Sequence, residues 1–253
     1  MTKHDFSNKV VSITGAGSGF GRLAAEKFAA ADARLVLSDI NPDALQEVTA
    51  GFGSDAVLAV ACDVSDETQV ANLFEQAKNV FGGVDIAVNN AGIIHDLVRT
   101  AEISEEVFDR NIAVNLKGTF LCMRHELRQM AAKGSGKIIN MASASGLIGS
   151  PFLSAYAAAK HGVVGLTRSA AVEYGRKGIQ INALCPAFSS TPMLDAVVEE
   201  RGAKVLEGIV GAIPMQRLAE PEEIVNAILW LSSDDNSFMN GAAVSVDGGL
   251  VAG

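Results

Sequence analysis

The feature that most constrains the fold is a regular alternation of short apolar runs with longer segments that carry helix signals. The runs are rich in β-branched residues, and most are apolar at successive positions, as strands covered by helices on both faces are. We expect seven strands: Val10 to Thr14, Arg34 to Asp39, Ala56 to Asp63, Val84 to Asn89, Lys137 to Met141, Ile179 to Leu184 and Ala243 to Val246.

Helix signals lie between these runs. Gly19 to Ala31 follows the first run and is expected to be helical, and Asn41-Pro42 places a cap residue and a proline at the start of a second helix that should end at Gly51. Ser65 and Ser104 are expected to cap two more helices.

A strand, helix and strand pattern that repeats six times favours a doubly wound parallel α/β sheet, because crossovers between parallel strands are right-handed. No linker or change in composition divides the chain, so residues 1–253 are expected to form a single domain. Ligands of such sheets bind at the carboxyl ends of the strands.

Composition excludes several classes of function. The first residues are polar, and no run of 18 apolar residues is free of charges or glycines, so we expect a cytoplasmic protein that does not enter a membrane. A net charge of −9 without a basic cluster argues against nucleic acid and anionic lipid as partners. The three cysteines and four histidines lack the spacing of metal ligands, so no metal site is expected.

A glycine-rich turn follows the first strand in Thr14-Gly15-Ala16-Gly17-Ser18-Gly19-Phe20-Gly21 and leads directly into a helix. Glycines permit a tight turn and a close approach of the backbone to a pyrophosphate, which is then stabilised by the positive end of the helix dipole. The turn alone is weak evidence, since a plain strand-to-helix connection has the same composition.

Asp39 ends the second strand, 18 residues after Gly21. A carboxylate at this position accepts hydrogen bonds from both hydroxyls of an adenosine ribose and repels a 2′-phosphate. Because neither Ser18 nor Ile40 offers a basic side chain for that phosphate, we expect NAD(H) rather than NADP(H). The alternative is that Asp39 only caps the following turn together with Asn41.

Tyr156 and Lys160 lie four residues apart in a segment of strong helix formers, and so share one helical face. A neighbouring ammonium group favours the phenolate and would tune the tyrosine as an acid and base. Such a pair is common on helix surfaces, but Ser143 lies 13 residues before Tyr156, directly after the fifth strand. Its hydroxyl would emerge at the same edge of the sheet.

Taken together, these motifs resemble the short-chain dehydrogenase/reductase family. The resemblance spans nearly the whole chain, and the order and spacing of the motifs make it specific. It rests on Thr14-Gly15-x-x-x-Gly19-x-Gly21, Asn89-Asn90-Ala91-Gly92, Asn115, Ser143, Tyr156-x-x-x-Lys160 and Asp247-Gly248-Gly249.

The resemblance implies a Rossmann-type fold and a set of catalytic roles. Ser143 orients the substrate oxygen, Tyr156 exchanges a proton with it, and Lys160 lowers the pKa of the tyrosine and holds the nicotinamide ribose. Asn115, expected at the end of another strand, positions a water that leads to solvent. The implied cofactor-binding residues are Gly15, Ser18, Gly19, Phe20, Gly21, Asp39, Ile40, Asp63, Val64, Asn90, Ala91, Gly92, Tyr156, Lys160, Pro186 and Thr191.

The chain departs from the family pattern at two positions. Ala187 follows Pro186 where the family commonly has glycine, which puts the backbone contact of that loop in question. Phe20 stands where isoleucine or leucine is usual, and we interpret it as a packing variation. Ser145 is an alternative catalytic hydroxyl, but the spacing favours Ser143.

The substrate is expected to be a secondary alcohol or ketone, apolar and cyclic or aryl-bearing, because the variable segment 187–214 is rich in apolar residues. Its candidate pocket residues are Phe188, Met193, Leu194, Val197, Val198, Val205, Leu206 and Ile209, with Leu147, Ile148 and Phe152 nearby. An amphipathic lid helix would show the same composition.

Two alternatives remain open. The pattern also resembles 3-oxoacyl-carrier-protein reductases, against which Asp39 counts because those enzymes generally use NADPH. The other is a non-catalytic NAD(H)-binding redox sensor, against which the intact catalytic set counts. The segment Leu153 to Tyr174 carries alanine, glycine and valine on more than one face, and together with the family resemblance it predicts a homotetramer.

Overall fold

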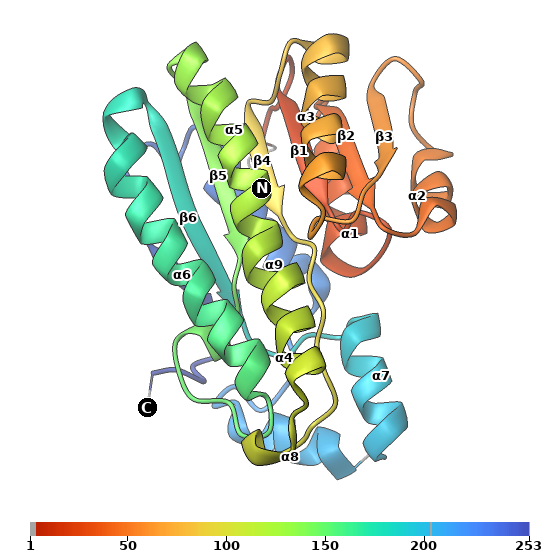
Figure 1. The fold of residues 1–253 in the computed structure, drawn as a ribbon, viewed down its shortest axis with the longest axis vertical. Coiled ribbons are helices and arrows are strands. Elements are labelled where there is room, and N and C mark those ends of the chain that lie inside the picture. The colour runs from red at the N-terminus through yellow and green to blue at the C-terminus, as the bar shows by residue number, and fades with distance from the viewer. Residues whose placement is uncertain (1–3, 203, 253) are drawn as a thin grey trace.

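The chain folds around a seven-stranded parallel sheet with the strand order β3-β2-β1-β4-β5-β6-β7 (Figure 1). The structure is a computed structural model that describes residues 4–202 and 204–252. The strands are β1 (Val10–Thr14), β2 (Arg34–Asp39), β3 (Val57–Ala61), β4 (Ile86–Asn89), β5 (Gly136–Met141), β6 (Ile179–Pro186) and β7 (Ala243–Val246). The expected doubly wound α/β sheet is therefore confirmed.

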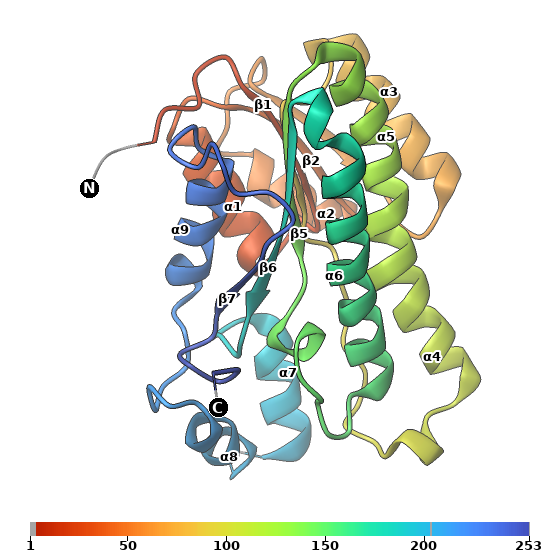
Figure 2. The same cartoon turned by 90° about the vertical axis from the view of Figure 1, so that its left-hand side faces the viewer.

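Helices cover both faces of this sheet. Figure 2 shows α1 and α9 on one side and α3, α5 and α6 on the other, with α7 and α8 below the carboxyl end of β6. The helices are α1 (Gly19–Ala29), α2 (Pro42–Thr49), α3 (Glu67–Phe81), α4 (Glu105–Asn111), α5 (Thr119–Lys133), α6 (Ser154–Tyr174), α7 (Pro192–Arg201), α8 (Lys204–Ala212) and α9 (Pro221–Ser232). None of them, within the described residues, has the length and apolar character that a membrane span requires.

The strands alternate between two hydrophobic clusters, one on each face of the sheet. Leu35 and Leu37 of β2 pack with α1, α2 and α9, whereas Val36 between them packs with α3, α5 and α6. Burial of each such side chain is worth about 1.5–3 kcal/mol. Two covered faces explain why the sequence shows continuous apolar runs instead of an alternation of apolar and polar residues.

The expected helix caps are partly right. Asn41 caps α2 by accepting from the N–H groups of Asp43 and Ala44, and Ser104 caps α4 by accepting from Val107. The prediction for Ser65 was wrong, because Asp66 caps α3. The Ser65 hydroxyl instead donates to Asp63 Oδ1 at 2.7 Å.

A polar cluster lies in the core under β4 and β5. Glu126 of α5 is fully buried, and its Oε2 accepts a hydrogen bond of 3.0 Å from Asn89 Nδ2. Asn89 Nδ2 also donates to Asn140 Oδ1, and Asn140 Nδ2 donates to Thr167. Burial raises the pKa of Glu126 to about 8, although the hydrogen bond from Asn89 acts in the opposite direction. Glu126 Oε1 and Asn89 Oδ1 have no partner, and a proton on the carboxyl group would supply the missing donor.

This buried acid should make stability depend on pH. Native Glu126 keeps a proton that the unfolded chain releases near its ordinary pKa, so the free energy of unfolding should fall by up to roughly 1.4 kcal/mol per pH unit between about pH 5 and 8. Glu126→Gln should remove this fall, because the amide does not titrate. The measurement is urea unfolding of both proteins across this range. Parallel pH dependences for the two proteins would contradict the assignment.

Candidate active site

The glycine-rich turn presents an uncapped helix end to a cleft at the carboxyl ends of β1, β2 and β4. Ser18 is the N-cap residue of α1, but its side chain makes no cap hydrogen bond, whereas α2 and α3 are capped by Asn41 and Asp66. The first N–H groups of α1 and the positive end of its dipole are thus available to an anionic ligand, so this end of the cleft fits the pyrophosphate of a dinucleotide.

Two glycines of the turn are required by close packing. A Cβ atom on Gly21 would lie 2.0 Å from the carbonyl oxygen of Gly15, and one on Gly15 would lie 2.9 Å from Ala91 Cα. Gly19 differs, since no heavy atom lies within 4 Å of its Cβ position and its φ is +51°. The lack of a side chain at Gly15 and Gly21 therefore allows the turn to pack closely against its neighbours, whereas the lack of one at Gly19 leaves open space in the cleft.

Asp39 lines the cleft at the end of β2. Its Oδ2 accepts from the Gly17 N–H at 2.8 Å and its Oδ1 from the Asn41 N–H at 2.9 Å, so the carboxylate does hold the turn as the alternative interpretation proposed. Each oxygen keeps a further lone pair for a ligand. Ile40 beside it is 68% exposed.

The structure brings most of the expected cofactor residues to this cleft. Gly15, Ser18, Gly19, Phe20, Asp39, Ile40, Asp63, Val64, Asn90, Ala91, Gly92 and Thr191 line it. Other residues that line it were not predicted from the sequence: Cys62, Ser65, Ile93, Arg110, Ala113, Val114 and Pro192. Arg110 to Val114 belong to the segment around Asn115, and no motif marked them as cleft residues.

Segment 90–93, which follows β4, joins this cleft to the catalytic residues. Asn90 Nδ2 donates to the carbonyl oxygens of Thr14 and Gly15, both at 3.0 Å. Thr14 Oγ1 accepts in turn from the N–H groups of Asn90 and Ala91. The side chain of Asn90 therefore braces the glycine turn.

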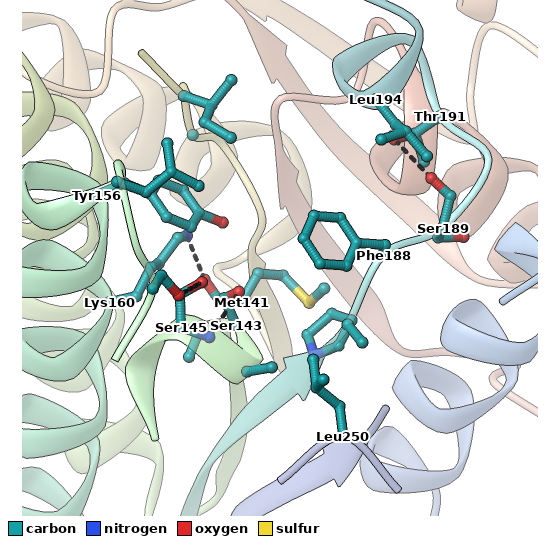
Figure 3. Close-up of a pocket in the computed structure, with 18 of the residues that line it drawn as sticks. Met141, Ser143, Ser145, Tyr156, Lys160, Phe188, Ser189, Thr191, Leu194 and Leu250 are labelled. Atoms are coloured by element: carbon teal, nitrogen blue, oxygen red, sulfur yellow. Dashed lines mark hydrogen bonds between the residues drawn. The ribbon is translucent and has the colours of Figure 1, made fainter. Parts of the chain in front are cut away.

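Ser143, Tyr156 and Lys160 meet in a second pocket that adjoins the cleft (Figure 3). Ser143 follows β5, and Tyr156 and Lys160 project from the first turns of α6. Ser143 Oγ accepts from the Ser145 N–H at 3.1 Å. Phe20, Asn90, Gly92 and Thr191 line both pocket and cleft, so a ligand in the cleft can extend to the tyrosine.

Burial shifts the pKa values of both Tyr156 and Lys160. It raises the pKa of Tyr156, while the hydrogen bond with Ser143 acts in the opposite direction. The ammonium lies 5.6 Å from the tyrosine ring centre and donates to the carbonyl oxygen of Met141 at 2.7 Å. Burial lowers the pKa of Lys160 to about 8. The net shift of the Tyr156 pKa is upward, and its lowering by Lys160 stays a prediction.

Asn115 lies in a π-helical segment, Ile112–Gly118, and not at the end of a strand as expected. Its side chain is fully buried and bridges to the backbone of Ile93, accepting from the N–H and donating to the carbonyl oxygen, both at 2.9 Å. It also donates to Asn111 Oδ1 at 3.2 Å. These bonds occupy the amide, so the side chain of Asn115 fixes the position of segment 90–93.

The catalytic pocket has a largely apolar wall opposite the tyrosine. Figure 3 shows Phe188 and Leu194 facing Tyr156 and Ser143 across the cavity, with Leu250 below them. Of the expected pocket residues, Phe188, Leu194 and Ile148 line it. Leu147, Phe152, Val198, Val205, Leu206 and Ile209 do not, and the side chains of Met193 and Val197 lie outside the described part of the structure.

Three residues that line the pocket were not expected from the sequence. They are Ile94, Leu153 and Leu250, and no short motif marked them.

The departure from the family pattern at Ala187 causes no backbone strain. Ala187 is not among the residues with positive φ, and its N–H donates to the carbonyl oxygen of Val246 at 3.2 Å. An alanine is therefore accommodated without strain where the family commonly has glycine.

The described residues contain no group of three or more histidine, cysteine, aspartate or glutamate side chains placed to hold a metal ion. The three cysteines are free and buried.

Comparison with known proteins gives consistent matches over the whole chain. A family model described as enoyl-(acyl carrier protein) reductase matches residues 15–251. A 2,5-dichloro-2,5-cyclohexadiene-1,4-diol dehydrogenase of Sphingobium indicum is 41% identical over 98% of this chain and 99% of its own length. A cyclohexanol dehydrogenase of an Acinetobacter species is 41% identical over 98% of this chain and 97% of its own length.

Solved structures agree with this result. Levodione reductase superposes with a TM-score of 0.94 and 41% identity, covering 98% of this chain and 99% of its own. A 3-ketoacyl-(acyl-carrier-protein) reductase from Brucella melitensis, complexed with NADH, has a TM-score of 0.90 and 36% identity, covering 97% of this chain and 99% of its own.

Gly92 provides a test of the site geometry. A Cβ atom on this residue would lie 2.8 Å from Asn115 Oδ1, so Gly92→Ala should displace the Asn115 side chain and lower kcat about tenfold or more. Gly53→Ala is the control, because Gly53 is exposed and nothing lies within 4 Å of its Cβ position. Turnover is measured together with the thermal midpoint. A wild-type kcat for Gly92→Ala would show that the position of the Asn115 side chain does not matter for turnover.

Proposed function

The chain belongs to the short-chain dehydrogenase/reductase family, and we propose that it is an NAD(H)-dependent dehydrogenase of cyclic secondary alcohols and ketones. It is an oxidoreductase of alcohol and ketone groups, as its relatives are. The observation that carries the proposal is the convergence of Ser143, Tyr156 and Lys160 in a largely apolar pocket that shares lining residues with the cleft of the glycine turn.

The proposed chemistry divides proton and hydride transfer. Tyr156 Oη takes the hydroxyl proton of the alcohol during oxidation and returns one to the carbonyl oxygen during reduction, and Ser143 Oγ orients that oxygen. The nicotinamide supplies or accepts the hydride at the same carbon, so the protein contributes mainly binding, orientation and a proton.

Lys160 and Asn115 serve as supporting groups in this proposal. The Lys160 ammonium has three donors, of which Met141 uses one, and the others remain for the nicotinamide ribose and for a water that leads to solvent. A ligand oxygen beside Nζ would also help to offset the cost of burying its charge. Asn115 holds segment 90–93 at a fixed position relative to these groups through its two hydrogen bonds to the backbone of Ile93.

The residues of the cleft fit a dinucleotide along its whole length. We propose that the uncapped end of α1 binds the pyrophosphate and that Asp39 binds the adenosine ribose. Asp63 and Val64 would contact the adenine, and Pro186 and Thr191 the nicotinamide carboxamide. Arg110, an exposed basic side chain of the cleft, would add attraction for the phosphates.

A cyclic substrate is favoured by the apolar wall of Ile148, Phe188, Leu194 and Leu250, and by the ring compounds in the names of the relatives.

The rival activity is that of a 3-oxoacyl-carrier-protein reductase. Coenzyme choice separates the two less well than the sequence suggested, because a structure with that name contains NADH. The net charge of −9 still counts against an acidic carrier protein as partner.

The remaining proposals concern the whole molecule. We propose one catalytic domain in which segment 187–214 shapes the substrate side, acting as a homotetramer in the cytoplasm. In support of an interface, α6 exposes small residues and Val172, which is 85% accessible.

Tyr156→Phe tests the central role of the phenol. The variant should still bind NADH, seen as a change in NADH fluorescence, while its kcat for cyclohexanol oxidation should fall by about a hundredfold or more because the proton acceptor is lost. Wild-type activity is followed by NADH absorbance with a panel of cyclic alcohols and with acetoacetyl thioesters. Nucleotide binding without turnover of any substrate by the wild-type protein would support the redox-sensor alternative instead.

Coenzyme choice should depend on the charge of Asp39. The wild-type kcat/KM should be higher with NAD⁺ than with NADP⁺, and Asp39→Asn should raise the NADP⁺ to NAD⁺ ratio about tenfold by removing the repulsion of a 2′-phosphate. Asp43→Asn is the matched control, because this exposed carboxylate lies on α2 and does not line the cleft. A wild-type preference for NADP⁺ would disprove the assignment.

A further inference from the structure

Two hydroxyl groups in the catalytic pocket have no part in the proposed proton transfer. Ser145 and Ser150 both line the pocket, and Ser150 Oγ donates to Ser145 Oγ at 2.7 Å. Both lie in the segment between β5 and α6, and Figure 3 shows Ser145 beside Ser143. Otherwise the pocket lining near them is apolar, with Ile148 and Leu153 from the same loop.

A count of hydrogen-bond donors leaves one proton of this pair unused. Each hydroxyl carries one donor, and the bond between them uses one. Neither hydroxyl makes another hydrogen bond within the described residues. Whichever way the pair is oriented, one O–H remains for a ligand. Ser189 differs, because its hydroxyl donates to the carbonyl oxygen of Ala219 at 2.7 Å.

The pair is also held in place relative to the catalytic groups. The N–H of Ser145 donates to Ser143 Oγ, so the backbone that carries the pair is bonded directly to the catalytic hydroxyl. A Cβ atom on Gly146 would lie 2.7 Å from the carbonyl oxygen of Lys160, which shows that this loop packs tightly against α6. A ligand atom bound by the pair would therefore stay at a defined distance from Tyr156.

We propose that the Ser145–Ser150 pair binds a second oxygen atom of a ring substrate, beyond the oxygen that reacts at Tyr156. The substrates that fit are cyclic diols, hydroxyketones and diones, and simple cyclic alcohols leave the free donor of the pair unmatched in an apolar wall. This inference rests on the proposed function. Binding of the second oxygen costs little conformational entropy, because the loop already orders the two hydroxyl groups.

The test compares cyclohexanol with the 1,2-, 1,3- and 1,4-cyclohexanediols as substrates with NAD⁺. Wild-type kcat/KM should be about fivefold or more higher for one of the diols than for cyclohexanol, as expected for one additional hydrogen bond. Ser145→Ala and Ser150→Ala should each remove most of this preference and change kcat/KM for cyclohexanol less than twofold. The double variant should lose no more than the larger single effect, because the two hydroxyls act as one unit.

Ser189→Ala is the matched control, since it removes a pocket hydroxyl that already has a protein acceptor, and it should leave the ratio of diol to cyclohexanol unchanged. An equal loss for cyclohexanol and diol in Ser145→Ala would overturn the proposal and give Ser145 a part in catalysis. Unchanged ratios in both alanine variants would overturn it as well. If the wild-type protein oxidised none of these alcohols, the proposed function would fail and this inference with it.

Discussion

The site depends on the hydrogen bonds of segment 90–93. At one end of the segment, Asn90 is bonded to the carbonyl oxygens of Thr14 and Gly15 and so holds the glycine turn. At the other end, the backbone of Ile93 is bonded on both sides by the amide of Asn115. A segment without regular secondary structure thus acquires a fixed position between the cleft and the pocket, where Asn90 and Gly92 line both.

The surroundings of Lys160 explain the shift of its pKa. Lys160 Nζ is buried, and its one hydrogen bond within the described residues goes to the Met141 carbonyl oxygen, with the Tyr156 ring centre 5.6 Å away. One such bond is worth about 1.5–3 kcal/mol, less than the several kcal/mol that desolvation of the charge costs. The pKa of Lys160 is lowered for this reason. The arrangement is therefore suited to a ligand that brings oxygen atoms to Nζ, as a ribose does.

Much of this architecture could be predicted from the sequence. Continuous apolar runs and the Asn41-Pro42 cap depend on neighbours in the chain, so the seven strands and the start of α2 were predicted well. The cofactor motif was readable because its glycines are required by contacts within the turn and with the next loop. The choice of Ser65 as a cap failed because Asp66, one residue later, is a stronger acceptor for the first turn of α3.

The remaining features depend on contacts between residues distant in sequence. The π-helical segment around Asn115 contains no glycine or proline before Gly118 to mark it, and the structural part played by Asn115 follows only from its side-chain bonds to Ile93 and Asn111. Leu250 reaches the pocket because the turn after β7 is held by Asp247, which accepts from the N–H groups of Gly249 and Val251. Apolar composition alone overestimated the contribution of α8, whose apolar residues Val205, Leu206 and Ile209 are only partly buried and do not line the pocket. The shape of the pocket is therefore determined by the tertiary fold, whereas its polar residues Ser143, Tyr156 and Lys160 could be located from short motifs.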